Sequence, residues 1–106
     1  MPKYLLAASL TQSGVQGVLK EGGSSRREAV QKTVQSVGGT LEAFYFAFGA
    51  TDVYLIVDVP DEAAAAAVSM TTTASGAVRV NTTVLITPEE MDKVKTKSVE
   101  YRPPGA

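Results

Sequence analysis

One stretch of the sequence, residues 40–60, constrains the fold more than any other. It reads TLEAFYFAFGATDVYLIVDVP, two apolar and aromatic runs that are each long enough for a β-strand and that meet at Gly49-Ala50. A glycine at the first position of a two-residue loop is typical of a tight β-hairpin turn. A strand with one wet face should alternate apolar and polar residues, whereas these runs are almost continuously apolar. The stretch therefore predicts a central hairpin with both faces covered.

A two-residue loop at Gly49-Ala50 would assign the hairpin side chains to two faces. One face is wholly apolar and suits a core beneath helices: Phe44, Phe46, Phe48, Val53, Leu55 and Val57. The other face is mixed: Leu41, Ala43, Tyr45, Ala47, Asp52, Tyr54, Ile56 and Asp58. A three-residue loop would instead shift the register by one residue and mix the two sets.

The mixed face of the hairpin carries enough apolar surface to require a cover. Exposed apolar area is unfavourable by about 25 cal/mol per Å². A second copy of the same sheet would cover the mixed face, because two-fold symmetry makes a patch self-complementary. The register therefore predicts a homodimer.

The segments before the hairpin predict one strand, a short helical turn and a long helix. Residues 3–10 are a short apolar run, read as a strand, and residues 11–21 place Val15, Val18 and Leu19 at helical spacing. The clearest helix should begin at Ser24-Ser25, where Ser25 and Glu28 match a capping box, and end at Gly38-Gly39.

The segments after the hairpin predict a helix, a strand and a last helix. Asp61 is a natural N-cap for the alanine-rich run that follows, and residues 77–86 alternate as a fourth strand should. Thr87-Pro88-Glu89-Glu90 forms a second capping box, and its helix should turn Met91 and Val94 inward.

This order of elements predicts an α+β fold of the ferredoxin-like βαββαβ type. A four-stranded antiparallel sheet in the order 4-1-3-2 and an extra C-terminal helix would form a single domain over residues 1–98. Residues 99–106 would be a tail. Because such a sheet carries its helices on one face only, the other face must be solvated or covered by something else.

Composition excludes several functional classes. The 106 residues include 10 basic and 11 acidic side chains, without the basic stripe of a nucleic-acid binder. No apolar run reaches the roughly 20 residues of a membrane span, and the N-terminus does not have the layout of a signal peptide. The chain has no cysteine and no histidine, the commonest metal ligands and catalytic groups. We expect a cytoplasmic protein without cofactor, metal site, nucleic-acid partner or membrane partner.

Several motifs together resemble those of the GYD domain family: residues 22–27 (GGSSRR), 38–39 (GG), 48–52 (FGATD), 60–61 (PD) and 75–79 (SGAVR). The resemblance extends from Tyr4 to about Glu90. These small bacterial proteins are similar to the dimeric α/β barrel group, so the resemblance implies that fold and a homo-oligomer. The family is named after a Gly-x-Tyr-Asp turn; Gly49 and Asp52 match it, and Thr51 stands at the tyrosine position.

Six residues are candidates for ligand binding: Ser9, Tyr45, Asp52, Tyr54, Arg79 and Asn81. In the predicted strand order they would share one sheet face. Asp52 could act as a base or hydrogen-bond acceptor, or could instead cap the turn. The tyrosines could line a pocket or pack at an interface. Arg79 could bind a carboxylate or phosphate, or pair with Asp52, Asp58 or a partner subunit.

A glycine-rich loop at a helix N-terminus suggests a second site, for an anion, at Ser24, Ser25 and Arg26. The loop lacks the spacing of a nucleotide-binding P-loop. Ordinary helix capping is the alternative explanation.

Two functions remain open. One is binding of an apolar or aromatic small molecule in the cavity of a dimeric α/β barrel, with enzymatic activity left open because relatives of that fold include cofactor-independent enzymes. The other is a non-catalytic assembly or regulatory module whose homo-oligomer is the functional unit.

Overall fold

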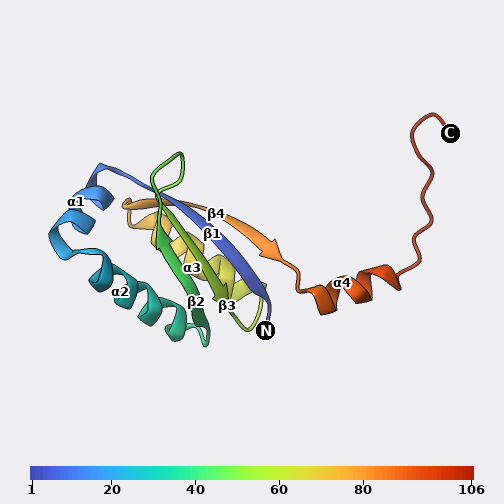
Figure 1. The fold of residues 1–106 in the computed structure, drawn as a ribbon, viewed down its shortest axis with the longest axis horizontal. Helices are drawn as coiled ribbons and strands as arrows, with labels where there is room; N and C mark the ends of the chain where they lie inside the picture. The colour runs from blue at the N-terminus through green and yellow to red at the C-terminus, as the bar shows by residue number, and fades with distance from the viewer.

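The computed structural model describes residues 1–106 and contains four strands and four helices (Figure 1). The elements are β1 (Lys3–Leu10), α1 (Gln12–Glu21), α2 (Gly23–Ser36), β2 (Thr40–Phe46), β3 (Val53–Asp58), α3 (Glu62–Ala74), β4 (Val78–Leu85) and α4 (Pro88–Lys95). No helix combines the length and the apolar character that a membrane span requires.

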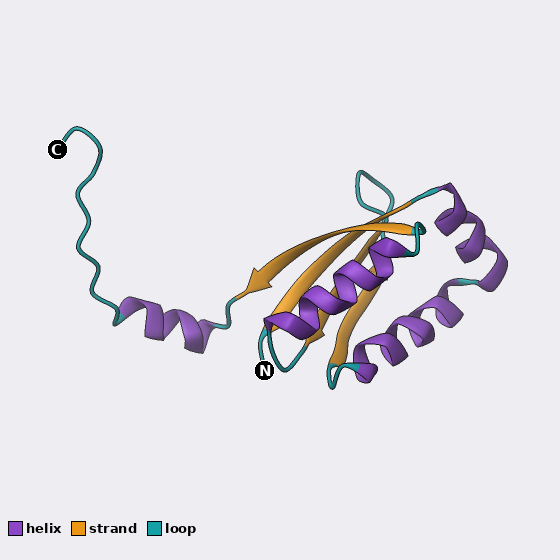
Figure 2. Ribbon diagram, turned by 180° about the vertical axis from the view of Figure 1, so that it is seen from behind, coloured by secondary structure: helices purple, strands orange, loops and turns teal.

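The strands form one antiparallel sheet in the order β2-β3-β1-β4. The connections that contain α1 with α2 and α3 lie on the same side of this sheet, and Figure 2 shows α3 in front of the strands. The predicted α+β, ferredoxin-like arrangement and the predicted strand order are confirmed. The segment predicted as a short helical turn is a full ten-residue helix, α1.

The hydrophobic core lies between the sheet and the helices. Its members are Tyr4, Leu6, Ala8, Val34, Val53, Leu55, Val57, Val59, Ala65 and Val68. Every second residue of β1 and of β3 belongs to it, as expected for strands whose successive side chains point to opposite faces. We call this side of the sheet the covered face and the other side the open face.

The hairpin register is confirmed near the loop, where Tyr45 pairs with Tyr54 and Phe46 with Val53. The prediction of a tight turn at Gly49-Ala50 was wrong. Both strands end earlier, and a wider loop is closed by a hydrogen bond of 2.7 Å from the Ala47 N–H to the Asp52 carbonyl oxygen. As a result Phe48 lies in the loop, fully exposed, instead of in the core.

The far end of the hairpin contains an irregularity that the sequence did not predict. The pairing of β2 with β3 shifts between Leu41 and Ala43, which leaves Glu42 as the extra residue of a β-bulge. Leu41 was predicted on the mixed face with Ala43. The bulge places it on the covered face, where it packs against the core.

Two of the three predicted N-caps are confirmed. The Asp61 carboxylate accepts the Ala64 N–H at 2.8 Å, and the Thr87 hydroxyl accepts the Glu90 N–H at 3.1 Å. The prediction of a capping box at Ser25 was wrong. Helix α2 begins at Gly23, directly after Gly22, and no side chain caps its N-terminus. Gly22 adopts a φ of 87°, a left-handed conformation that separates α1 from α2 and that glycine adopts readily.

The C-terminal segment projects from the body of the protein (Figures 1 and 2). We call residues 86–106, which include α4 and the tail, the C-terminal arm. Met91 and Val94 were predicted to point inward, but each is 51% exposed, and Val99 and Tyr101 are more exposed still. The segment with the amphipathic pattern forms a helix, but no surface of the same chain covers the apolar side of this helix.

Candidate functional site

The open face of the sheet holds the six residues predicted to bind a ligand. Tyr45 pairs with Tyr54, Tyr54 lies beside Ala7, and Ala7 pairs with Asn81 on its other side. This row of side chains crosses the whole sheet. Ser9 and Arg79 are paired one step further along. The strand order therefore brings the predicted set together, as expected.

Asp52 has a backbone partner that defines its role. Its carboxylate accepts the Leu10 N–H at 2.8 Å, while its own N–H donates to the Ala8 carbonyl at 3.0 Å. It thus extends the pairing of β1 and β3 by one step beyond the last strand residue. The alternative of a cap within the turn does not describe this geometry, because the partner of the carboxylate lies on β1. Ligand binding by Asp52 stays a prediction.

Arg79 is not held by an ion pair. The three salt bridges of the chain join Lys3 to Glu42, Lys3 to Asp58, and Arg26 to Glu21. The predicted alternative of a pair with Asp52 or Asp58 in the same chain was therefore wrong. The guanidinium of Arg79 is exposed beside Ser9, at the end of the open face that lies far from Lys3.

The other end of the open face carries a compact charge cluster. Lys3 Nζ lies 2.7 Å from Glu42 Oε2 and 2.7 Å from Asp58 Oδ2. The hydrogen bond to Asp58, followed by that to Glu42, raises the pKa of Lys3 above its ordinary value of 10.5. The β-bulge makes this contact possible by turning Glu42 toward the open face.

A cavity of about 330 Å³ lies on the covered face, between α2 and α3. We call it the interhelical cavity. It forms because α2 packs on β2 and α3 packs on β4, which leaves a space over the two central strands between the helices. Its lining residues are Leu6, Ala8, Leu10, Val18, Arg26, Val30, Thr33, Phe44, Phe46, Val53, Leu55, Val68, Thr71, Thr72, Ser75, Ala77, Val78 and Val80.

The polar groups of the interhelical cavity are mostly satisfied within the protein. The hydroxyls of Thr33, Thr72 and Ser75 donate to carbonyl oxygens of their own helical turns, at 3.1, 2.8 and 2.6 Å. Arg26 is the one charged residue in the lining. Its guanidinium Nη1 lies 3.4 Å from Glu21 Oε2, and both side chains are partly exposed. The cavity is thus apolar, with a single cation.

The three residues of the predicted anion site, Ser24, Ser25 and Arg26, have different surroundings in the structure. Since α2 begins at Gly23, the two serines lie within its first turn, exposed to solvent. Only Arg26 contributes to a cavity. The three residues lie together, and binding of an anion there stays a prediction.

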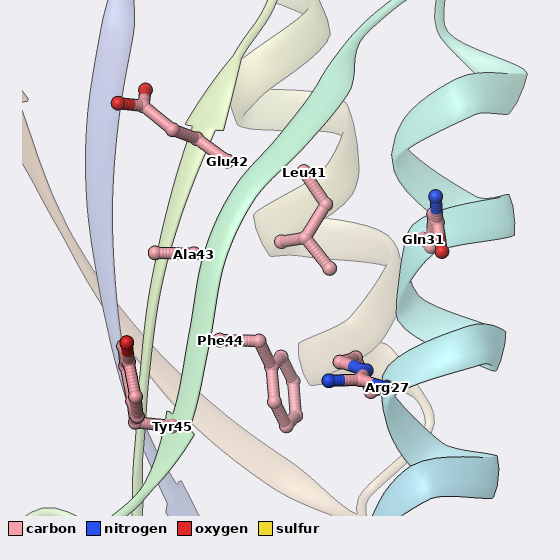
Figure 3. A pocket seen from close by; sticks show the side chains of 7 residues that line it. All are labelled: Arg27, Gln31, Leu41, Glu42, Ala43, Phe44 and Tyr45. Carbon is pink, nitrogen blue, oxygen red and sulfur yellow. The ribbon is translucent and has the colours of Figure 1, made fainter.

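A second hollow of about 310 Å³ runs along the outer edge of β2. Figure 3 shows Leu41 and Phe44 pointing toward α2, where Arg27 and Gln31 face them. Glu42, Ala43 and Tyr45 point to the other side of the strand. This groove is shallower and more polar than the interhelical cavity. Tyr45 is the one residue of the predicted ligand set that lines either hollow.

The interhelical cavity was missed by the sequence analysis. The apolar face of the hairpin was identified, but it was assigned to a filled core. One signal was present: the small side chains at Ala8 and Ala77 leave space that larger ones would fill. No cluster of three or more potential metal ligands is present.

Comparison with known proteins gives one match. The sequence model of the GYD domain family matches residues 4–94, which is most of the chain. No curated protein and no solved structure matches this sequence.

Proposed function

This chain belongs to the GYD domain family, and we propose that it binds an apolar or aromatic small molecule in its interhelical cavity and acts as a homo-oligomer. The single observation that carries the binding proposal is the cavity itself. Its volume of about 330 Å³ lies at the lower end of the roughly 300–1,000 Å³ usual for small-molecule pockets.

The chemistry of the lining determines the class of ligand. Thirteen of the eighteen lining residues are hydrophobic. Because three of the four lining hydroxyls already have backbone partners, a polar ligand would have to give up its hydrogen bonds to water with little return. An aliphatic or aromatic body loses nothing comparable, so the lining favours apolar ligands.

The open face supports the second half of the proposal. Tyr45 is 71% exposed and Tyr54 42% exposed. Leu5 and Ala7 of β1 lie half-buried between these tyrosines and β4, and Ile56 is half-buried beside Leu5 on β3. Tyrosine is enriched in the cores of protein interfaces, and a partner surface would remove the apolar neighbours of these tyrosines from water. A two-fold axis through the face would set a second copy of the same sheet against it. In that arrangement the six predicted residues would line a seam between subunits.

Binding can be tested by partly closing the cavity. Thr71 lies at its rim on α3, so Thr71→Phe should obstruct it without disturbing the core. Thr73→Phe is the matched control, because Thr73 is exposed and lies outside the lining. Calorimetric titration with 2-naphthol and 1-octanol should give heats for the wild type and for Thr73→Phe, and weaker binding for Thr71→Phe. Absence of binding to the wild type, or equal affinity in both variants, would contradict the proposal.

A second candidate function is assembly without a ligand, favoured by the C-terminal arm as well as by the open face. The arm exposes Met91, Val94 and Tyr101 away from the body. Native mass spectrometry separates the two functions, because it measures subunit number and retained ligand together. Dimers with added mass support binding, whereas dimers that bind neither probe support assembly alone.

The oligomer itself has a direct test. Ile56→Glu would place a carboxylate in the middle of the open face, beside Leu5. Leu19→Glu is the control, because Leu19 is 81% exposed on α1, far from that face. Light scattering should show smaller particles for the first variant only. A monomeric wild type would overturn the oligomer while leaving the cavity proposal standing.

A further inference from the structure

We propose that the ligand of the interhelical cavity is an apolar monocarboxylate, whose carboxylate pairs with Arg26 while its apolar body occupies the space between α2 and α3. This inference rests on the proposed binding function and names the class of molecule that the same cavity would hold.

The first argument is the solitary charge. Arg26 contributes the one charged side chain of a lining that is mostly apolar, and three of its four hydroxyls are bonded to backbone carbonyl oxygens. A planar guanidinium offers two parallel N–H donors to a carboxylate, a geometry that is stronger and more directional than a single bond. A ligand with one anionic end and one apolar end therefore matches the distribution of polarity in the cavity.

The second argument is the loose internal partner of Arg26. Its contact with Glu21 is 3.4 Å, against 2.7 Å for the two contacts of Lys3, and it joins the end of α1 to the first turn of α2. The side chains are 39% and 47% exposed. Exposed pairs of this kind contribute little to stability. A ligand carboxylate can thus replace Glu21 at small cost, and without a ligand Glu21 keeps the arginine from being unpaired.

The third argument is a contrast with the neighbouring arginine. Arg27 lies on α2 one residue further on, but it faces the shallow groove at the edge of β2 (Figure 3). That groove also contains the Glu42 carboxylate, which disfavours an anion. Only Arg26 combines a positive charge with an adjoining apolar volume, so Arg27 provides a matched control.

Two pairs of probes test the inference. Octanoate and 1-octanol share an alkyl chain, and 2-naphthoate and 2-naphthol share a ring system, so that each pair differs chiefly in charge. Calorimetry on the full chain should show that the wild type binds each carboxylate more tightly than its neutral analogue. Arg26→Gln should weaken carboxylate binding by roughly tenfold or more, the usual effect of losing a hydrogen bond to a charged group. It should leave binding of the alcohol and the phenol unchanged.

Glu21→Gln sharpens the test because it removes the competing carboxylate. It should tighten octanoate binding by roughly two- to fivefold, the range of an exposed ion pair. Arg27→Gln should change neither probe. Both arginine variants should keep the melting temperature of the wild type, since neither residue belongs to the core.

The outcomes distinguish failure of this inference from failure of the proposed binding function on which it rests. If 1-octanol and 2-naphthol bind and Arg26→Gln weakens all probes equally, the cavity binds ligands but the carboxylate inference is wrong. If Arg27→Gln reproduces the loss, the effect is one of net charge, and the inference is again wrong. If no probe binds the wild type, the proposed binding function fails, and the inference fails with it.

Discussion

The two faces of the sheet are built from the same strands but differ in how deeply their side chains are buried. Along β1, Tyr4, Leu6 and Ala8 are at most 6% exposed, whereas the residues between them remain partly accessible. The difference does not come from the strands, because both faces of β1 carry apolar side chains. It comes from the connections, since both crossovers return on the same side. Apolar sequence makes a residue suitable for burial, and chain topology decides whether it is buried.

The largest effect should come from removing equal side chains on the two faces. Leu6→Ala leaves a cavity in the core and should lower the free energy of unfolding by about 2–5 kcal/mol. Leu5→Ala, one residue away on the open face, should cost about 1 kcal/mol or less. Urea unfolding followed by circular dichroism, with dilute protein, measures both values.

This pair of leucine variants also tests the proposed oligomer. A cost of Leu5→Ala that increases with protein concentration is expected if a second copy covers the open face. Equal costs for the two variants in dilute protein would contradict the distinction between the faces.

A second pair of changes tests how closely α1 packs on the covered side. A methyl group on Gly14 would clash with the Ala77 carbonyl oxygen, so Gly14→Ala should cost about 1–3 kcal/mol. Gly17 has no neighbour within 4 Å of such a methyl group, so Gly17→Ala should stabilise the protein by about 0.5–1 kcal/mol. Thermal unfolding should therefore shift in opposite directions. A shift in the same direction would mean that α1 does not approach the Ala77 carbonyl this closely.

A third comparison separates a helix that covers the sheet from one that covers nothing. Asp61→Ala removes the cap of α3 and should lower the free energy of unfolding by about 1 kcal/mol. Thr87→Ala removes an equivalent cap from α4 but should leave global unfolding unchanged, because the arm can fray while the body stays folded. Hydrogen exchange should show faster exchange confined to α4. Equal global losses would show that the arm is packed in solution.

The smallest effect concerns the charge cluster on the open face. Folding raises the pKa of Lys3 above 10.5, chiefly through its hydrogen bond to Asp58, so the folded state binds the proton more tightly than the unfolded state. The contribution is therefore complete below pH 10.5 and is lost as the pH rises through the higher, folded value. The stability difference between the wild type and Lys3→Met should shrink in that alkaline range. A constant difference would mean that Lys3 acts only through packing.

Local patterns predicted most of the fold. Apolar runs, the alternation of residues 77–86 and capping residues identified all four strands and the starts of α3 and α4, because those signals depend on neighbours in the sequence. The errors were of a different kind. The start of α2 depends on the left-handed Gly22, and the inward packing of Met91 depends on a surface that the same chain does not supply.

The candidate site was only partly predictable. Strand order was enough to place Ser9, Tyr54 and Arg79 on one face. The partner of Asp52 was not predictable, and small side chains alone could not locate the interhelical cavity, because both depend on distances between elements that sequence periodicity does not encode. How far α2 stands from α3 results from the packing of each on a different edge strand.

The extra residue at Glu42 has a consequence for how this strand tolerates change. A regular strand has a parity: odd positions serve one side and even positions the other. The bulge resets this parity, so Leu41 joins the core while Glu42 reaches Lys3. Deleting Glu42 would restore the alternation and remove the Lys3 contact in one step. A deletion at the bulge therefore keeps every other β2 side chain on its present face, and the wide loop at residues 47–52 can also change length without inverting either face.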